Sequence, residues 1–165
     1  MNSFKLKRYE SFIELKDDLK EDTILISETL SDSNKFIKAN NDLFEAGFIY
    51  YDTGLQPQIK MLYQAQKIFL GVNQIFSCID YMENKKMFEA ELPSLLYDVL
   101  VDLDCIYVVC VCELDIFVYQ NDGTLLWNMG FRDTVESYYL DDESIIIECS
   151  DGERTTFQLD SGAVK

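Results

Sequence analysis

The sequence predicts a mostly β protein with a minor helical part: an antiparallel sheet or sandwich that ends in hairpins and carries one short N-terminal helix. Three observations predict this class. Short apolar runs follow one another from residue 47 onward, and turn-forming residues separate them. Two of these turns contain Asp-Gly, at 122–123 and 151–152. Amphipathic helical spacing is clear in a single stretch, residues 11–20.

The length and composition fit a single folded domain. At 165 residues, folding hides roughly 70% of the surface that the unfolded chain exposes. Apolar residues make up 48% of the chain, which excludes disorder caused by low hydrophobicity, and no apolar run reaches the ~18 residues of a membrane-spanning helix. We expect one domain over residues 1–165, with a helix, strand and loop region at 1–46 and an antiparallel β region at 47–165.

One stretch near the N-terminus, SFIELKDDLK, carries the helical signal. Phe12, Leu15 and Leu19 recur at helical spacing, with charged residues between them. Ser11 and Glu14 form a capping box, which satisfies backbone donors at the start of a helix. A short helix is therefore expected to begin just after Ser11.

The rest of the N-terminal region is less regular. TILISE at 23–28 has the β-branched composition of a strand, whereas LSDSNKFIKANND at 30–42 is polar and is expected to be a loop or a short helix. Residues 1–9 alternate charged and apolar side chains without the apolar core of a secretory signal. We therefore expect a cytoplasmic protein.

From residue 47 to residue 92 the sequence predicts a series of strands. The predicted strands are FIYYD, PQIKMLYQ, KIFLGV, QIFSCIDYM and KKMFEAEL. Met82 to Lys85 give a short connection, so the last two strands are expected to pair as a hairpin. After Pro93, SLLYDVLVD fits either a helical turn or a strand.

The last third of the chain is more regular. IYVVCVCE and DIFVYQ are almost wholly apolar, as expected of central strands that are covered on both faces. The Asn121-Asp122-Gly123 turn then returns the chain into TLLWNM as a hairpin. SIIIECS, the Asp-Gly turn and ERTTFQLD repeat this arrangement 29 residues later, and a further turn follows at 160–162.

These repeated hairpins resemble the blades of quinoprotein-like β-propellers. The likeness lies in DIFVYQNDGTLLW and, after an acidic linker, in SIIIECSDGERTTFQLDSGAVK, with Trp127 in the position of the blade tryptophan. The resemblance implies propeller-blade-like hairpins in the C-terminal third. A closed propeller needs at least four blades, and the N-terminal half shows no convincing copies. We therefore expect an open or curled antiparallel sheet, or a sandwich.

Histidine and cysteine usage argues against catalysis. The chain has no histidine, which removes the commonest general base and the commonest zinc ligand, and we expect no enzyme activity and no catalytic residues. Five cysteines are an odd number without C-x-x-C spacing, and they are expected to be buried thiols: Cys78, Cys105, Cys110, Cys112 and Cys149. In a strand, Cys110 and Cys112 would point to the same face.

Charge is unevenly distributed along the chain. The formal net charge is −16. Residues 1–90 hold 11 basic and 14 acidic residues, a balance of −3, whereas residues 91–165 hold 3 and 16, a balance of −13. Such a field repels nucleic acid and anionic membranes, and it steers a basic protein toward the acidic surface. A solubilising role is the alternative explanation of the same charge.

The acidic clusters do not predict a metal or cofactor site. Asp102 and Asp104 flank a leucine, and Asp141, Asp142 and Glu143 form a run, but neither has the spacing of a calcium loop. The run is expected to be a solvated turn. No phosphate-binding glycine motif occurs. We therefore expect no metal and no cofactor.

The leading functional interpretation is a class-level likeness. Acidic, histidine-free, mostly β chains of this length resemble immunity proteins of contact-dependent inhibition and polymorphic toxin systems. The resemblance implies a monomer that binds one cognate basic toxin domain, expected to be a nuclease, and blocks its active-site cleft by acidic contacts or by strand addition. The expected contact residues are Asp115, Asp122, Asp133, Glu136, Tyr138, Tyr139, Asp141, Asp142 and Glu143.

Two alternatives come from other classes. One is a non-catalytic protein-interaction scaffold with propeller-like repeats. The other is a carboxylate-based hydrolase, for which no pair of acids stands out among the sixteen in residues 91–165.

Overall fold

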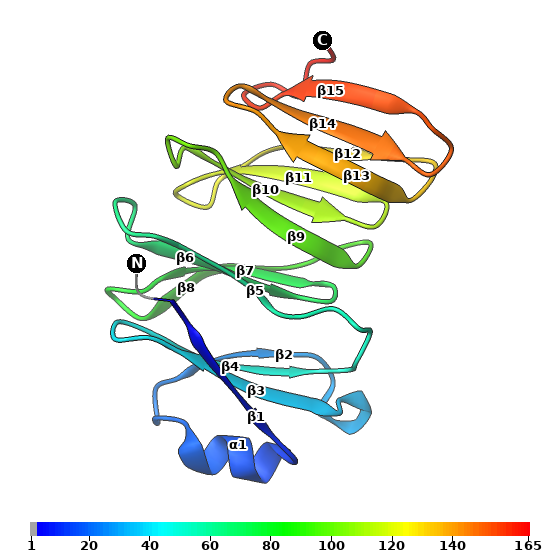
Figure 1. Cartoon of the computed structure of the whole chain (residues 1–165). Coiled ribbons are helices and arrows are strands. Elements are labelled where there is room, and N and C mark those ends of the chain that lie inside the picture. Colours follow the sequence, from blue (N-terminus) through cyan, green and yellow to red (C-terminus); the bar gives the residue numbers. More distant parts are fainter. Residues whose placement is uncertain (1–2) are drawn as a thin grey trace.

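The protein folds into four small β-sheets that are stacked in the order of the chain (Figure 1). The computed structural model describes residues 3–165. Most of the described chain is strand, the pairing is almost entirely antiparallel, and one α-helix lies near the N-terminus. The predicted fold class is confirmed, but the strands form separate stacked sheets.

The first sheet has the order β1-β3-β4-β2, and β2 is parallel to β4. Its strands are β1 (Lys5–Tyr9), β2 (Ile24–Ser27), β3 (Lys35–Asn40) and β4 (Glu45–Tyr50). The helix α1 (Phe12–Asp18) lies between β1 and β2 in the chain, and a short 3-10 turn, η1 (Leu30–Asp32), lies between β2 and β3.

The helix α1 covers the outer face of the first sheet. Since β1 and β2 run in the same direction on opposite edges, the chain must cross the sheet between them, and α1 makes this crossing. Leu15 is fully buried there. Leu19 approaches Gly47 so closely that a Cβ at Gly47 would lie 3.0 Å from its Cδ1. The Ser11 hydroxyl accepts the Glu14 N–H, so the predicted N-cap is confirmed.

The second and third sheets are simple four-stranded meanders. The second contains β5 (Gln58–Leu62), β6 (Lys67–Val72), β7 (Ile75–Asp80) and β8 (Lys85–Glu91). The third contains β9 (Leu96–Val101), β10 (Tyr107–Cys112), β11 (Asp115–Gln120) and β12 (Leu125–Gly130). The β7–β8 and β11–β12 hairpins confirm the two predicted pairings.

The fourth sheet has three strands, β13 (Val135–Leu140), β14 (Ser144–Cys149) and β15 (Arg154–Gln158). Trp127 of β12 ties it to the third sheet. Its indole N–H donates to the Leu159 carbonyl at 2.7 Å, and its ring packs against Phe157. Gly162 lies against the same ring, where a Cβ would come within 2.8 Å of an indole carbon.

Three apolar layers hold the four sheets together. Alternate side chains of one strand pack in two different layers. Ile68 and Leu70 of β6 face the first sheet, whereas Phe69 faces the third. In β10, Cys110 and Cys112 join the second layer and Val109 joins the third. This two-sided burial explains the continuous apolar runs in the sequence, and it confirms that the two cysteines share a face.

Three expectations about local structure are corrected. The segment 30–42, expected to be a loop or a short helix, begins with the 3-10 turn η1 but also contains the strand β3, because Ile37 and Ala39 are buried on one face and β1 and β4 pair with it on both sides. The acidic linker before β14 contains β13, whose Val135 is buried in the third layer. The second sheet is a four-stranded antiparallel meander like the third and begins in the N-terminal half, so the expectation of no blade-like copy there is wrong. The ambiguous segment after Pro93 is the strand β9.

Candidate interaction groove

The unpaired edge of β5 borders the largest hollow that we describe, with a volume of about 870 Å³. β5 is the edge strand of the second sheet, and in the described part of the chain its one strand partner is β6. Every residue from Pro57 to Ala65 lines the hollow. Because successive side chains of a strand point to opposite faces, a hollow lined by all of them runs beside the strand's edge.

The other walls of this hollow come from the neighbouring sheets and are mostly apolar. Phe4 and Leu6 contribute from the first sheet, and Val101 and Leu103 contribute from the third. Three large side chains remain open to solvent: Leu6 is 50% exposed, Tyr63 45% and Leu103 85%. Exposed apolar side chains gathered at one hollow are a feature of binding surfaces.

A second hollow, of about 520 Å³, continues the first toward the fourth sheet. The two hollows share Lys60 and Val101 to Leu103. The far wall of the second is formed by Tyr138 to Asp142, and the Tyr139 side chain is 64% exposed. We call the two hollows together the edge groove. It passes along the side of all four sheets.

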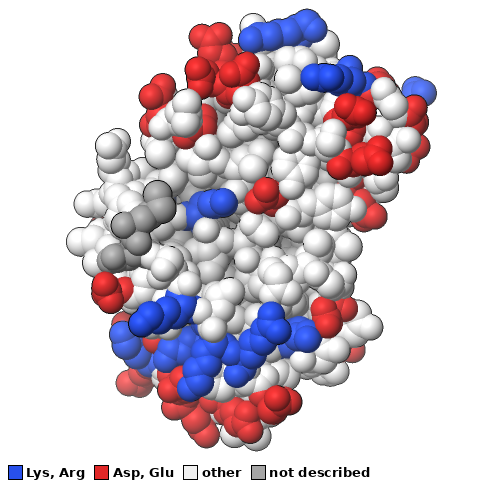
Figure 2. Space-filling view, viewed as in Figure 1, with Lys and Arg blue, Asp and Glu red and all other residues white. Residues whose placement is uncertain are grey.

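Lys60 is the cation of the edge groove. It is half-buried and lines both hollows, and among residues 3–165 it forms no ion pair. Figure 2 shows that the middle of this face carries few charges, while basic side chains gather over β1 and β3. Lys5, Lys7 and Arg8 of β1 are exposed. A charged group of a ligand in the groove would therefore meet Lys60 in a mostly apolar setting.

The acids along the groove differ in their roles. Asp102 is buried, and its carboxylate accepts the N–H groups of Ile106 and Tyr107 at 2.8 and 2.6 Å, so it shapes the β9–β10 turn. Asp141 and Asp142 are exposed at the end of the groove. The Tyr138 hydroxyl donates to Asp98 at 3.3 Å, and burial raises the pKa of Tyr138.

Five of the nine residues expected at an interface lie around the β13–β14 turn. Tyr138, Tyr139, Asp141 and Asp142 line the edge groove, and Glu143 lines a small hollow beside it together with Asp142. These residues follow one another in the chain, so the turn itself brings them together.

The other four lie elsewhere. Asp133 is at the opposite end of β13, where its carboxylate accepts from the Ser150 hydroxyl, and that bond lowers the pKa of Asp133. Asp115 accepts from the Ser94 hydroxyl, and Asp122 accepts the Thr124 N–H within its turn. Glu136 is exposed on β13. The nine residues do not form one continuous patch.

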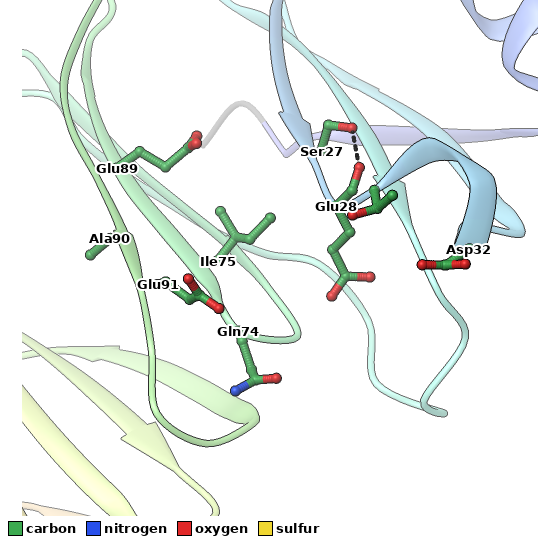
Figure 3. Close-up of a pocket in the computed structure, with 9 residues that line it drawn as sticks. Ser27, Glu28, Asp32, Gln74, Ile75, Glu89, Ala90 and Glu91 are labelled. Carbon is green, nitrogen blue, oxygen red and sulfur yellow. Dashed lines mark hydrogen bonds between the residues drawn. The ribbon is translucent and has the colours of Figure 1, made fainter.

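A separate acidic hollow lies between the outer strands β2 and β8 of the first two sheets. Figure 3 shows Glu28 and Asp32, which follow β2, across from Glu89 and Glu91 of β8. Glu28 accepts the side-chain amide of Asn73 at 3.1 Å, and Glu89 pairs with Lys86 at 2.6 Å. Two of these four carboxylates, Glu28 and Glu89, are therefore held by contacts within the protein.

Lys60 and Leu103 were not among the residues that the sequence marked as candidates. Lys60 is the only basic residue in the β5 run, and Leu103 is an apolar residue between two aspartates in a turn. A lysine inside an apolar strand and a leucine inside an acidic turn both indicate a side chain that is kept at the surface. Their proximity depends on stacking of the second and third sheets, which the sequence did not show.

Other kinds of site find no geometric support in the described chain. Among residues 3–165, no three histidine, cysteine or acidic side chains are placed to hold a metal ion together. Within the same residues, no helix has the length and apolar character needed to cross a membrane.

Comparisons with known proteins identify the fold. No family model matches the sequence, and no curated protein matches it. Sqt1 of Saccharomyces cerevisiae is structurally similar, with a TM-score of 0.55 and 12% identity over 79% of this chain and 42% of that one. The β-propeller domain of Cps50 (Swd1) from Myceliophteria thermophila matches with a TM-score of 0.52 and 10% identity, over 69% and 38% of the two chains.

The described sheets are thus blades of the β-propeller type, and the likeness shows the fold alone. The U3-55K structure gives a TM-score of 0.53 at 11% identity, over 69% of this chain and 39% of that one. The chain spans about two fifths of the length of these three structures. Its four sheets form an open stack in which α1 covers the outer face of the first sheet (Figure 1).

Proposed function

We propose that the protein is a non-catalytic protein-interaction module that binds a segment of a partner protein in the edge groove. The observation that carries the proposal is the groove itself, which runs along an unpaired strand edge and is lined by exposed apolar side chains. The β-propeller fold supports it, because propellers commonly serve as interaction platforms.

The energetics of the groove favour a peptide-like ligand. Fully covering a leucine-sized side chain contributes about 1.5–3 kcal/mol. Leu6, Tyr63, Leu103 and Tyr139 are spaced along the groove, one near each sheet. An extended chain can contact all four, whereas a compact small molecule would cover one or two.

Toxin neutralisation receives less support. That interpretation rested on acidic charge, and nothing in the comparisons points to an immunity protein. Its expected contact residues are spread over the third and fourth sheets, whereas the groove is mainly apolar. The interaction-scaffold alternative fits the geometry better.

A displayed library of random peptides, selected on the purified protein, tests the proposal. We expect peptides with several large apolar residues to be enriched. Leu103→Glu should abolish their binding, because it places a charge in the groove without disturbing a buried residue. Met82→Glu is the matched control, since Met82 is a 64% exposed residue at another hairpin tip, outside the groove.

The outcome is decisive in either direction. Enrichment of peptides that lose binding to Leu103→Glu and keep binding to Met82→Glu supports the proposal. Selection that enriches no peptide, or peptides that bind both variants equally well, would overturn it.

A further inference from the structure

We propose that the partner segment binds as an added β-strand on the free edge of β5, with an acidic side chain placed beside Lys60. This inference rests on the proposed function and specifies how the groove would be used. The partner is an extended segment of another protein, and its backbone would extend the second sheet.

The edge of β5 offers unused backbone groups. β5 pairs residue by residue with β6, from Gln58 opposite Gly71 to Leu62 opposite Lys67. Within residues 3–165, no other backbone hydrogen bond involves residues 58–62. In an antiparallel pair each strand directs about half of its N–H and C=O groups away from its partner. Those of β5 are directed along the groove, where an added strand can reach them.

The two faces of β5 set the side-chain pattern of the added strand. Ile59 and Met61 pack on the first apolar layer, whereas Lys60 also lines the hollow beside the third sheet. A strand added next to β5 would continue the same alternation. Alternate side chains would meet Phe4 and Leu6 on one side, and those between them would meet Lys60 and Leu103 on the other.

The charges along the edge groove limit which partner sequences would fit it. Lys60 is a half-buried cation that pairs with no acid among residues 3–165, and a carboxylate beside it would form a charge-assisted contact in mostly apolar surroundings. Asp141 and Asp142, at the end of the groove, favour a basic residue there. The expected segment therefore has apolar residues around a central acid and a basic residue toward the β13–β14 turn.

A second copy of this chain fits the edge less well. Pairing two β5 edges would bring together two Lys60 side chains, and lysine on an edge strand disfavours self-pairing. Two molecules with a net charge of −16 each also repel one another. Because of these two repulsions, the favoured occupant of the edge is an acid-containing segment of a different protein.

The first test is backbone methylation of a peptide selected on the wild-type protein. N-methylation removes one N–H donor at a time and keeps the side chain. We expect binding to fall by about tenfold at every second position and little at the positions between, because an added strand directs only alternate N–H groups at β5. Equal losses at all positions, or none, would overturn strand addition.

The second test exchanges the charges. Lys60→Glu should weaken the selected peptide by at least about tenfold, and changing the peptide's central acid to lysine should restore binding to Lys60→Glu. Lys16→Glu, on the exposed face of α1, is the control with the same change in net charge. Peptides that bind Lys60→Glu as well as wild type would contradict the acidic contact.

The outcomes separate the two proposals. If peptide binding depends on Leu103 but shows no alternating effect of N-methylation, the proposed interaction groove stands and strand addition is overturned. If the protein binds no peptide but associates with itself, and Lys60→Glu alters that self-association, the edge of β5 would belong to a second copy and this inference would be overturned. Size-exclusion chromatography of the wild type and of both charge variants detects self-association.

Discussion

Asn73 connects three of the four sheets through one side chain and its own backbone. Its amide donates to Glu28 and to the Tyr51 carbonyl, at 3.1 and 2.8 Å, and accepts from the Thr53 hydroxyl at 2.7 Å. Its carbonyl accepts the Leu96 N–H at 2.7 Å. It also has a φ of +50°, a region where asparagine is favoured over other non-glycine residues.

Asn73→Ala should therefore destabilise the protein by about 2–4 kcal/mol, since it removes hydrogen bonds to a carboxylate and places alanine in a left-handed conformation. Urea denaturation measures the change in the free energy of unfolding. Asn128→Ala, at an exposed position of β12, should change it by less than about 0.5 kcal/mol. Equal effects at the two positions would refute the role of Asn73.

The cysteines are expected to differ in reactivity. Burial raises the pKa of Cys78 and of Cys112 to about 12 and the pKa of Cys110 well above its usual value. Cys149 is also buried, whereas Cys105 is partly exposed in the β9–β10 turn. At pH 8 a thiol reagent should label Cys105 first, and the other four should react only on unfolding. Mass spectrometry after brief labelling checks this order.

At the scale of elements, strand patterns were predictable and packing partners were not. The apolar runs and the turns between them predicted β5 to β8 and β10 to β12, and the runs are most continuous in β6 and β10, whose two faces are both buried. β3 was missed because lysines interrupt its apolar residues, and β13 because it lies in the acidic stretch before β14; pairing with neighbouring strands decides their structure. The edge groove was hidden for the same reason, because Lys60 and Leu103 meet only when two sheets stack.

α1 is held to the first sheet by a cluster of charges as well as by Leu15. Asp18 accepts from the Tyr9 hydroxyl and from Lys7 at 3.1 Å, and these bonds lower the pKa of Asp18 to about 2. Burial would raise the pKa of Glu45, but hydrogen bonds, including one from the Lys20 N–H, and the nearby Lys38 lower it overall.

Docking of α1 should therefore weaken in acid. A carboxyl group whose pKa is lower in the folded state stabilises that state above its unfolded pKa of about 4, and the contribution is lost as pH falls toward 2. Protection factors of the α1 amides, which are exchange rates divided into the rates of unstructured peptides at the same pH, should fall over this range. Asp18→Asn should remove part of the pH dependence. Protection factors that stay constant from pH 5 to pH 2 would contradict this role of Asp18.

The whole molecule is a stack of sheets with an uneven charge. The third and fourth sheets lie in the part of the chain with a balance of −13. Like charges at this density repel one another, and few cations lie among them.

Salt should therefore stabilise the protein. Screening shortens the range of repulsion to about 10 Å at 0.1 M ionic strength. We expect the urea midpoint to rise as sodium chloride is added at neutral pH. A midpoint that falls with salt would mean that ion pairs such as Lys67 to Asp80, at 2.9 Å, outweigh the repulsion.

The most direct measurement is NMR mapping of a selected peptide on the isotopically labelled protein. We expect amide shifts to change from Gln58 to Ala65 and around Leu103, and to stay constant at Glu89 and Glu91 in the acidic hollow. Changes confined to the acidic hollow, or to the outer face of the fourth sheet, would contradict a binding site at the edge of β5.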